Sequence, residues 1–558
     1  MAPASPKAKA YPLMSRGDIE ALIASGRKLI IVDQYVLKVD PFVSYHPGGE
    51  KAIEHMIGRD ATDEVTVLHS PEAKEMMLRY RVGKIEGRWT NFLPPIQGGV
   101  FRTAEQIAER TDDSDSDKDV NSSTSASREP SPLFDETHDQ GARQRRTAAG
   151  STQSVSSESA AEEEMDGMSY LDSITREHIK LDLDMYPDVD LATQDHIIAK
   201  YRELHDKIKA AGLYECNYWA YAVECCRYVA CFVTSMTCLY FGRYFLSAVA
   251  LGCLWHQLVF TAHDAGHMGI THNFQIDSIL GIFIANFMGG LSMGWWKRSH
   301  NIHHIVTNAP EHDPDIEHLP FFAISHRLLG NLRSTYYDRV MKYDAMAKFM
   351  MRIQAWTYYP ILSLARFNLT FLSMDYIIAH RGPRKGPAAW HWWLEIAGIV
   401  FFWTWYGYGI LYRTIPDNWS RFVFLFITNF VPSPLHLQIV LSHFAMSTAD
   451  LGPNESFPQK MLRTTMDIDC PEWLDFIHGG LQFQAIHHLY PRIPRHNLRA
   501  TRKLVQQFCD EVGIPYALYG FTNSNKKVLG TLSEVSRQAA ILAKCQRTIV
   551  KEGVGRHH

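Results

Sequence analysis

The chain has 558 residues, a formal net charge of −4 and 46% hydrophobic residues. This length corresponds to about two or three domains, and the weakly acidic balance excludes a bulk electrostatic attraction to nucleic acid. The mean hydropathy of −0.19 is typical of a soluble protein, but polar ends dilute a strongly apolar middle.

The cysteines and the N-terminal end indicate a reducing compartment. The nine cysteines include no Cys-x-x-Cys pair and no paired framework, so we expect reduced thiols. The first part of the chain lacks the apolar core of a cleaved signal peptide. We therefore expect the N-terminal side to remain in the cytosol.

A compact soluble domain is predicted over residues 11–95. Residues 29–32 and 35–39 are short strand-like runs. The motif His46-Pro47-Gly48-Gly49 then forces a tight turn directly after a histidine, and a second histidine follows at His69. With these motifs the region resembles the cytochrome b5 domains.

That resemblance implies a small α+β fold and axial ligation of haem b by His46 and His69. Two axial histidines leave no open iron site, so such a haem passes electrons and does not activate oxygen. Family members usually have phenylalanine where Val65 stands, which predicts looser haem packing. The acidic residues expected to form the docking face for a reductase are Glu50, Asp60, Asp63 and Glu64.

Residues 101–166 are predicted to be a disordered linker rich in serine, threonine and acid. Such a composition cannot bury enough apolar surface to offset the entropy of ordering. A plain tether is the favoured role, and serine phosphorylation is the alternative. The expected division is therefore a haem-binding domain (1–100), the linker (101–166) and a membrane domain (167–558).

Six apolar segments follow the linker. Four have about the 20 residues that cross a bilayer, and these predicted transmembrane helices are 221–240, 244–262, 392–411 and 422–441. Two others, 274–296 and 356–378, are interrupted by glycines or by charged residues. We expect these two to lie in the membrane interface.

Three histidine-rich motifs accompany the apolar segments. They are His263-Asp264-Ala265-Gly266-His267, Ser299-His300-Asn301-Ile302-His303-His304 and Gln484-Ala485-Ile486-His487-His488. Spacings of three and four residues put these side chains on one face of a helix. Imidazole clusters suit iron, copper, nickel or zinc.

The predicted membrane topology tests whether the three histidine motifs can form one site. The first two motifs follow the second predicted span, and the third motif follows the fourth. An even number of crossings separates them, so all three can converge on one side. If both interfacial segments crossed the membrane instead, the first and second motifs would lie on opposite sides.

More imidazoles are present than one metal can bind, so two metals are implied. The predicted ligands are His263, His267, His300, His303, His304, His487 and His488, with His443 as an eighth. The residues predicted to orient these imidazoles by hydrogen bonds are Asp264, Asn308, Asp313 and Asp315. For His256, lining a lipid channel and ordinary helix packing remain equally open.

Residues 195–520 resemble the membrane fatty-acid desaturases. The glutamine that opens the third motif, Gln484, and the fused cytochrome b5 domain are typical of the front-end group. The runs 479–484 and 488–492 extend the match beyond the histidines. Within this group the chain is most similar to the fungal Δ8-sphingolipid desaturases.

The resemblance implies a mostly α-helical membrane domain with a cytosolic, histidine-rich di-iron cap. It implies that O2 and two electrons convert two adjacent methylenes of a ceramide or sphingoid base into a double bond. Electrons would come from NADH-cytochrome b5 reductase through the fused haem, in the endoplasmic reticulum membrane. Gln484 would lie at or beside the two iron ions, and the polar head near residues 295–298.

Three alternatives remain. Ala485-Ile486 stands where many relatives have isoleucine and glutamate, so a front-end Δ5 or Δ6 acyl desaturase is the main competitor. A cytochrome b5-fused lipid 2-hydroxylase would use similar histidine clusters but would insert oxygen. A haem carrier or scaffold without catalysis is the third, and a degenerate site of that kind would be expected to have lost ligands.

Overall fold

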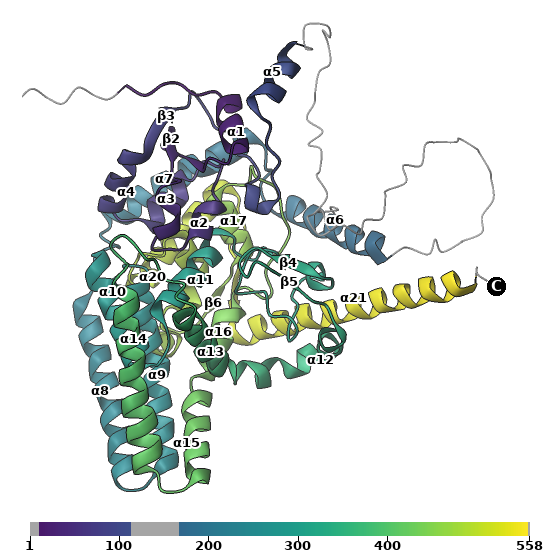
Figure 1. Cartoon of the computed structure of the whole chain (residues 1–558). Helices are drawn as coiled ribbons and strands as arrows, with labels where there is room; N and C mark the ends of the chain where they lie inside the picture. The colour runs from purple at the N-terminus through teal and green to yellow at the C-terminus, as the bar shows by residue number, and fades with distance from the viewer. Residues whose placement is uncertain (1–9, 113–166, 556–558) are drawn as a thin grey trace, which may run out of the picture.

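The computed structural model of the protein describes residues 10–112 and 167–555. In Figure 1 a small N-terminal domain lies at one end, a mostly helical cap adjoins it, and long helices project from the opposite side of the cap. This arrangement confirms the predicted fold class. The predicted linker residues 113–166 lie outside the described residues.

The N-terminal domain is built on an antiparallel sheet in the order β1-β2-β3. Successive strand residues face opposite sides of a sheet. Accordingly, Leu29 and Ile31 of β1 pack in one apolar cluster, whereas Ile30 and Val32 pack in another. The elements of the domain are α1 (Arg16–Ala24), β1 (Leu29–Val32), β2 (Tyr35–Lys38), η1 (Val43–Tyr45), α2 (Glu50–Glu54), α3 (Thr62–Leu68), α4 (Pro71–Met77), η2 (Leu78–Tyr80), β3 (Arg81–Lys84) and η3 (Pro95–Gln97).

The first residues of the predicted linker are ordered. Residues 104–112 form the helix α5 (Ala104–Asp112), so the expectation of disorder was wrong for this part. The Phe101 ring packs edge-on against Phe92 at 5.3 Å, and the Arg102 Nε atom pairs with Glu20 Oε1 at 2.8 Å. These contacts attach the segment to the haem-binding domain, which composition alone did not reveal.

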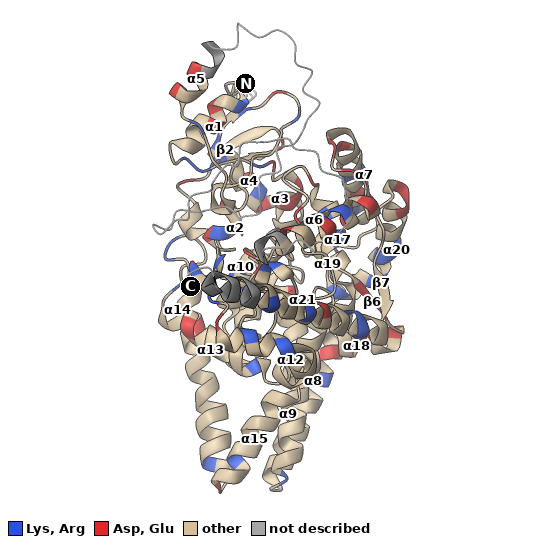
Figure 2. Ribbon diagram, turned by 90° about the vertical axis from the view of Figure 1, so that its right-hand side faces the viewer, with Lys and Arg blue, Asp and Glu red and all other residues tan. Residues whose placement is uncertain are grey.

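Among the described residues, four helices are long and apolar enough to cross a membrane, as predicted. Figure 2 shows them almost free of charged residues between their two ends. Two of them are interrupted, one by π-helical turns and one at Pro432. The spans are α8 (Tyr218–Tyr240), α9 (Tyr244–Gly266), α14 with η7 (His391–Phe402 and Trp403–Thr414) and α15 with α16 (Asn418–Phe430 and Ser433–Leu441).

The two segments expected in the interface are broken helices. The first bends by 118° and the second by 77°. Gly290 has a φ of +68° at the first break, a conformation that favours glycine. There the Arg366 Nη2 atom donates to the Gly289 carbonyl at 2.5 Å. The segments are α10 (Phe274–Ile282) with η5 (Phe283–Met288) and α11 (Met293–Ile305), and α12 (Ala345–Leu362) with α13 (Ala365–Ile378).

The cap surrounds the ends of these helices. Tyr201 is buried, stacks on Tyr490 at 5.3 Å and donates its hydroxyl to the Leu489 carbonyl at 2.7 Å. This contact fixes α19 against α7. The cap elements are α6 (Gly167–Met185), α7 (Leu191–Ala210), η6 (His326–Leu328), β4 (Leu332–Ser334), β5 (Arg339–Met341), α17 (Phe457–Thr464), β6 (Asp467–Asp469), η8 (Glu472–Leu474), α18 (Asp475–His478), η9 (Leu481–Phe483), α19 (Gln484–Leu489), α20 (Arg495–Val512), β7 (Leu518–Gly520) and α21 (Phe521–Gly555).

Arg463 on α17 joins two distant segments of the cap. Its side chain is 1% exposed and pairs with Asp182 at 2.8 Å and Glu455 at 2.7 Å. Removal of the cation would leave two carboxylates without a counter-charge, which typically costs about 3–5 kcal/mol. We expect Arg463→Met to lower the melting temperature of the detergent-purified protein by about 5 °C or more. Arg537→Met, which removes an exposed pair with Glu534, should change it little; equal melting temperatures for the two variants would contradict the role of Arg463.

Candidate metal centre and haem site

Histidines from the three predicted motifs meet where the helical bundle joins the cap. The first pair ends α9, the next three lie on one face of α11, and the last pair lies on the short helix α19. The bend before α11 turns this helix away from the direction of α10. The motif spacing therefore serves to present side chains from three helices to one region.

One group of imidazoles comes from all three motifs. His263, His267, His300 and His487 each offer a ring nitrogen, and these four atoms lie within 4.8 Å of one another. His267 Nε2 is buried and has no hydrogen-bond partner within the described residues. The first group is therefore a candidate metal site.

A second group lies beside it. His303, His443 and His488 offer ring nitrogens that again lie within 4.8 Å of one another. Within the described residues, His443 Nδ1 and His488 Nε2 are buried without a partner. The geometry thus brings the predicted eighth ligand, His443, next to the histidines of the second and third motifs.

His304 connects the two groups. Its Nε2 atom lies 3.1 Å from Nε2 of both His300 and His487, and its ring stacks on His488 at 4.3 Å. Two nitrogens that each bind one metal at about 2.1 Å are separated by about 3 Å. The His304 spacing therefore fits shared coordination.

Several of the eight imidazoles have buried ring nitrogens without a hydrogen-bond partner within the described residues, and two metal ions would bind these nitrogens. Buried polar atoms without a partner are rare in proteins, and several of these nitrogens face only other imidazoles. Burial, reinforced by the neighbouring imidazoles, holds the pKa of His267, His304 and His488 well below its usual range. These rings are therefore neutral at physiological pH, which is the state that binds a metal.

His303 has a different environment. Its Nδ1 atom lies 2.8 Å and 3.0 Å from the two carboxylate oxygens of Asp313. Burial alone would lower the pKa of His303, but Asp313 and Asp315 outweigh it and raise this pKa to about 9. Asp313 thus holds Nδ1–H and fixes the orientation of the ring whose Nε2 atom a metal would bind, as a residue that orients a metal ligand does. Asp315 is 3.9 Å from the Nδ1 atoms of both His300 and His303.

The two other predicted orienting residues contact different groups. The Asn308 amide donates to the backbone carbonyl of His443 at 2.9 Å, and not to an imidazole. The Asp264 carboxylate accepts from Arg495 at 2.5 Å, whereas His263 Nδ1 lies 3.8 Å away, too far for a hydrogen bond. Asn308 therefore positions a backbone, and Asp264 anchors the end of α9.

Arg495 is a positioning residue that the motifs did not reveal. Its guanidinium is 5% exposed and binds both Glu224 of α8 and Asp264 of α9. Carboxylates within apolar helices need a cationic or hydrogen-bonding partner. The presence of Glu224 and Asp264 in apolar helices therefore indicated that a cationic partner exists. The sequence did not specify which arginine would bind them.

Three other residues noted in the sequence are placed as follows. Gln484 is buried at the first position of α19 on the face of His487 and His488, and its side chain makes no hydrogen bond within the described residues. The Trp296 ring stacks on His300 at 4.5 Å and so packs against the first group. His256 contacts Phe260 and belongs to neither histidine group.

In the N-terminal domain the rings of His46 and His69 lie opposite one another. The ring centres of His46 and His69 are 5.9 Å apart. Imidazoles on opposite sides of one metal, each with its nitrogen about 2 Å away, have ring centres about 6 Å apart. The Nδ1 atoms face the carbonyls of Gly49 at 2.9 Å and Val65 at 3.2 Å, which leaves both Nε2 atoms for a haem iron. The pair therefore fits haem ligation.

The haem-ligand loops lie directly against the cap. A Cβ atom at Gly48 would lie 2.9 Å from Nδ2 of Asn301 on α11, so glycine permits this close approach. The Arg492 Nη1 atom donates to the His69 carbonyl at 2.9 Å. Arg492 lies four residues after His488, so a short path of one hydrogen bond and covalent bonds joins His69 to the second histidine group.

The same docking occupies part of the predicted reductase face. Glu50 pairs with Arg298 at 2.8 Å, and Asp63 pairs with Arg202 at 2.8 Å. In this arrangement these two carboxylates therefore bind the chain's own cap and are not available to another protein.

We expect His46→Ala and His69→Ala to abolish the haem absorbance of the full chain, because each removes one axial ligand. His55→Asn changes another histidine of the same domain, whose Nδ1 contacts Gln97, and should retain the haem. The reduced-minus-oxidised spectrum of each purified variant checks this. An unchanged spectrum for His46→Ala would refute the ligand assignment.

Gln484→Ala should reduce turnover strongly while most of the metal is retained, because an amide oxygen is a weaker ligand than imidazole and also acts by hydrogen bonding. His487→Ala should lose both metal and activity. Metal content per protein and product yield should be measured together. Full activity in Gln484→Ala would place this residue outside the site.

Comparisons with known proteins agree with this arrangement. Residues 16–86 match the cytochrome b5-like heme/steroid binding domain, and residues 243–520 match the fatty acid desaturase family.

Similar proteins also extend over the whole chain. A protein of Emericella nidulans is 58% identical over 98% of both chains, and one of Lachancea kluyveri is 45% identical over 97% of this chain and 96% of its own. One of Candida albicans is 42% identical over 95% and 96%. All three are described as Delta 8-(E)-sphingolipid desaturases. The chain therefore belongs to the fatty acid desaturase family, as a member fused to a cytochrome b5-like domain.

Proposed function

We propose that this protein is a Δ8-(E)-sphingolipid desaturase that introduces a trans double bond into the long-chain base of a ceramide or related sphingolipid. The observation that carries the proposal is the similarity over nearly the full length, at 58% identity, to a relative of that description. Identity of this extent includes the haem domain, the histidine motifs and the spans.

The chemistry of the site supports an oxidative reaction. Methylenes within an alkyl chain have no acidic proton, so general acid–base catalysis cannot remove their hydrogens. Two iron ions, held by the histidines of the two groups, would supply the oxidising power with O2 as co-substrate. The contribution of the protein is to fix the imidazoles, exclude water and position the alkyl chain.

The fused domain supports electron supply within the chain. A haem b held by His46 and His69 would carry one electron at a time, and Arg492 holds its ligand loop beside the histidine groups. We further propose that an NADH-cytochrome b5 reductase reduces this haem. The protein would lie in the endoplasmic reticulum membrane with both sites on the cytosolic side.

The alternatives receive less support. Plant proteins described as Delta(8)-fatty-acid desaturases match 54% and 61% of this chain at 34% and 35% identity. The acyl substrate therefore remains the second candidate. A 2-hydroxylase and a scaffold without catalysis have no such match among these relatives.

Expression in a yeast that lacks these lipids tests the proposal. We expect a new double bond between carbons 8 and 9 of the long-chain base, located by mass spectrometry, and no product from a His300→Ala variant that retains its haem spectrum. New double bonds confined to acyl chains would favour the second candidate. Hydroxylated lipids without a double bond would favour the 2-hydroxylase.

A further inference from the structure

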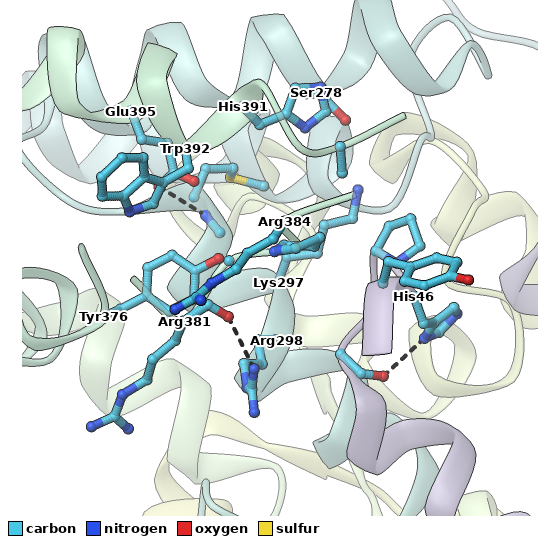
Figure 3. Close-up of a pocket in the computed structure, with 18 of the residues that line it drawn as sticks. His46, Ser278, Lys297, Arg298, Tyr376, Arg381, Arg384, His391, Trp392 and Glu395 are labelled. Atoms are coloured by element: carbon cyan, nitrogen blue, oxygen red, sulfur yellow. Dashed lines mark hydrogen bonds between the residues drawn. The ribbon is translucent and has the colours of Figure 1, made fainter. Parts of the chain in front are cut away.

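A cavity of about 330 Å³ lies between the haem-ligand loop and the membrane domain. Figure 3 shows that its walls come from α10, α11, α13 and α14, with His46 at one side. Its lining includes Gly266, which precedes the metal-site residue His267, and Gly294, which lies six residues before His300. The cavity therefore extends close to the histidine groups.

A fixed carboxylate forms part of this cavity. Glu395 of α14 is 2% exposed, and its Oε2 atom accepts hydrogen bonds from Ser292 Oγ at 2.5 Å, Gly294 N at 3.2 Å and Asn286 Nδ2 at 3.2 Å. Its Oε1 atom has no partner within the described residues. An ionisable group within an apolar span indicates a functional site, and here one oxygen is held in place while the other is free.

A second polar group lies beside the free oxygen. The Tyr376 hydroxyl has no hydrogen-bond partner within the described residues, although the side chain is only 4% exposed. A Cβ atom at Gly294 would lie 2.6 Å from this hydroxyl and would collide with Glu395 Oε1. Both atoms therefore lie directly against Gly294, where only glycine leaves room for them.

We propose that this cavity binds the polar head of the sphingolipid, with Glu395 Oε1 accepting hydrogen bonds from its hydroxyl or amide N–H groups and the Tyr376 hydroxyl contacting a head-group oxygen. The proposal rests on the proposed function and deepens it.

The free oxygen of Glu395 favours donors. The head of a long-chain base carries hydroxyls and a nitrogen-bound hydrogen close to the start of the alkyl chain. The ester that begins a glycerolipid acyl chain carries no donor, and a phosphate near the carboxylate would be repelled. A site built to bind a donor rejects analogues without one, because its buried polar group is left unpaired.

The cations around the cavity do not contradict this preference. Arg298 pairs with Glu50 at 2.8 Å, and Arg381 pairs with Asp375 at 2.8 Å. Arg384 and Lys385 are exposed at the rim, where cations near a membrane surface attract anionic lipids. Lys297 also lines the cavity, with its Nζ atom 5.1 Å from the centre of the Phe274 ring. The part of the cavity next to Gly294 presents a carboxylate and a hydroxyl.

The distance along α11 fits the position of the double bond. From Gly294 to His300 the helix rises about 9 Å, at about 1.5 Å per residue. Seven carbon–carbon bonds of about 1.5 Å, at angles near 111°, extend about 9 Å from carbon 1 to carbon 8. A head bound at Gly294 would therefore place carbon 8 level with the histidine groups.

The test compares two substrates in purified holoenzyme. A ceramide and its 1-deoxy analogue should be supplied to the wild type, to Glu395→Gln and to Tyr408→Phe, an exposed tyrosine of the same span. We expect the wild type and Tyr408→Phe to prefer the ceramide by about tenfold in kcat/KM. In Glu395→Gln the amide places a donor in the cavity, so the preference should fall to about twofold or less, mainly through a higher KM. Haem and iron contents should equal those of the wild type.

Tyr376→Phe and Gly294→Ala are further variants if Glu395→Gln does not fold. Gly294→Ala would displace the two polar groups and should weaken cross-linking of a ceramide with a photoreactive group at its head to residues 376–395. An undiminished substrate preference in Glu395→Gln, or undiminished cross-linking in Gly294→Ala, would overturn the head-group site. A wild type that desaturates no sphingolipid would instead refute the proposed function.

Discussion

The structure depends on holding eight imidazoles together, several of them with ring nitrogens that face other imidazoles. His304 Nε2 lies 3.1 Å from two other Nε2 atoms, and nitrogens without a shared proton repel at this distance. A cation between them removes the conflict, and the fold supplies the geometry in advance. Arg495, Asp313 and Tyr201 each fix one of the helices that present these rings.

The sequence predicted the parts of the site that depend on local spacing. The motif around His300 specifies one helix face, and the count of crossings specifies one side of the membrane. The four spans were predictable because about 20 apolar residues have few other stable arrangements. The strands β1 and β2 were predictable because two short, mostly apolar runs are separated by a turn at residues 33 and 34.

Other features depend on contacts between distant segments. The break at Gly290 is stabilised by Arg366, which lies 76 residues later in the chain, and the partners of Glu224 and Asp264 lie on α20. The helix α5 directly follows Phe101 and Arg102, which contact the N-terminal domain, although its composition resembles a linker. No local pattern specifies such pairings, so spacing alone predicted which histidines lie together better than it predicted the residues that position them.

The helix α11 relates the sites to one another. Arg298 and Asn301 contact the haem-ligand loop, the histidines at 300, 303 and 304 belong to the metal groups, and Gly294 borders the cavity with Glu395. Each residue advances the helix by about 1.5 Å and turns it by about 100°. The spacing between these residues therefore determines how the haem-ligand loop faces the histidine groups, and it would determine how far a lipid head in the proposed site lies from them. Because α11 is set at a steep angle to its neighbour α10, a single rigid helix contacts the haem-ligand loop, the histidine groups and the cavity, and would fix the relative positions of haem, metal and lipid.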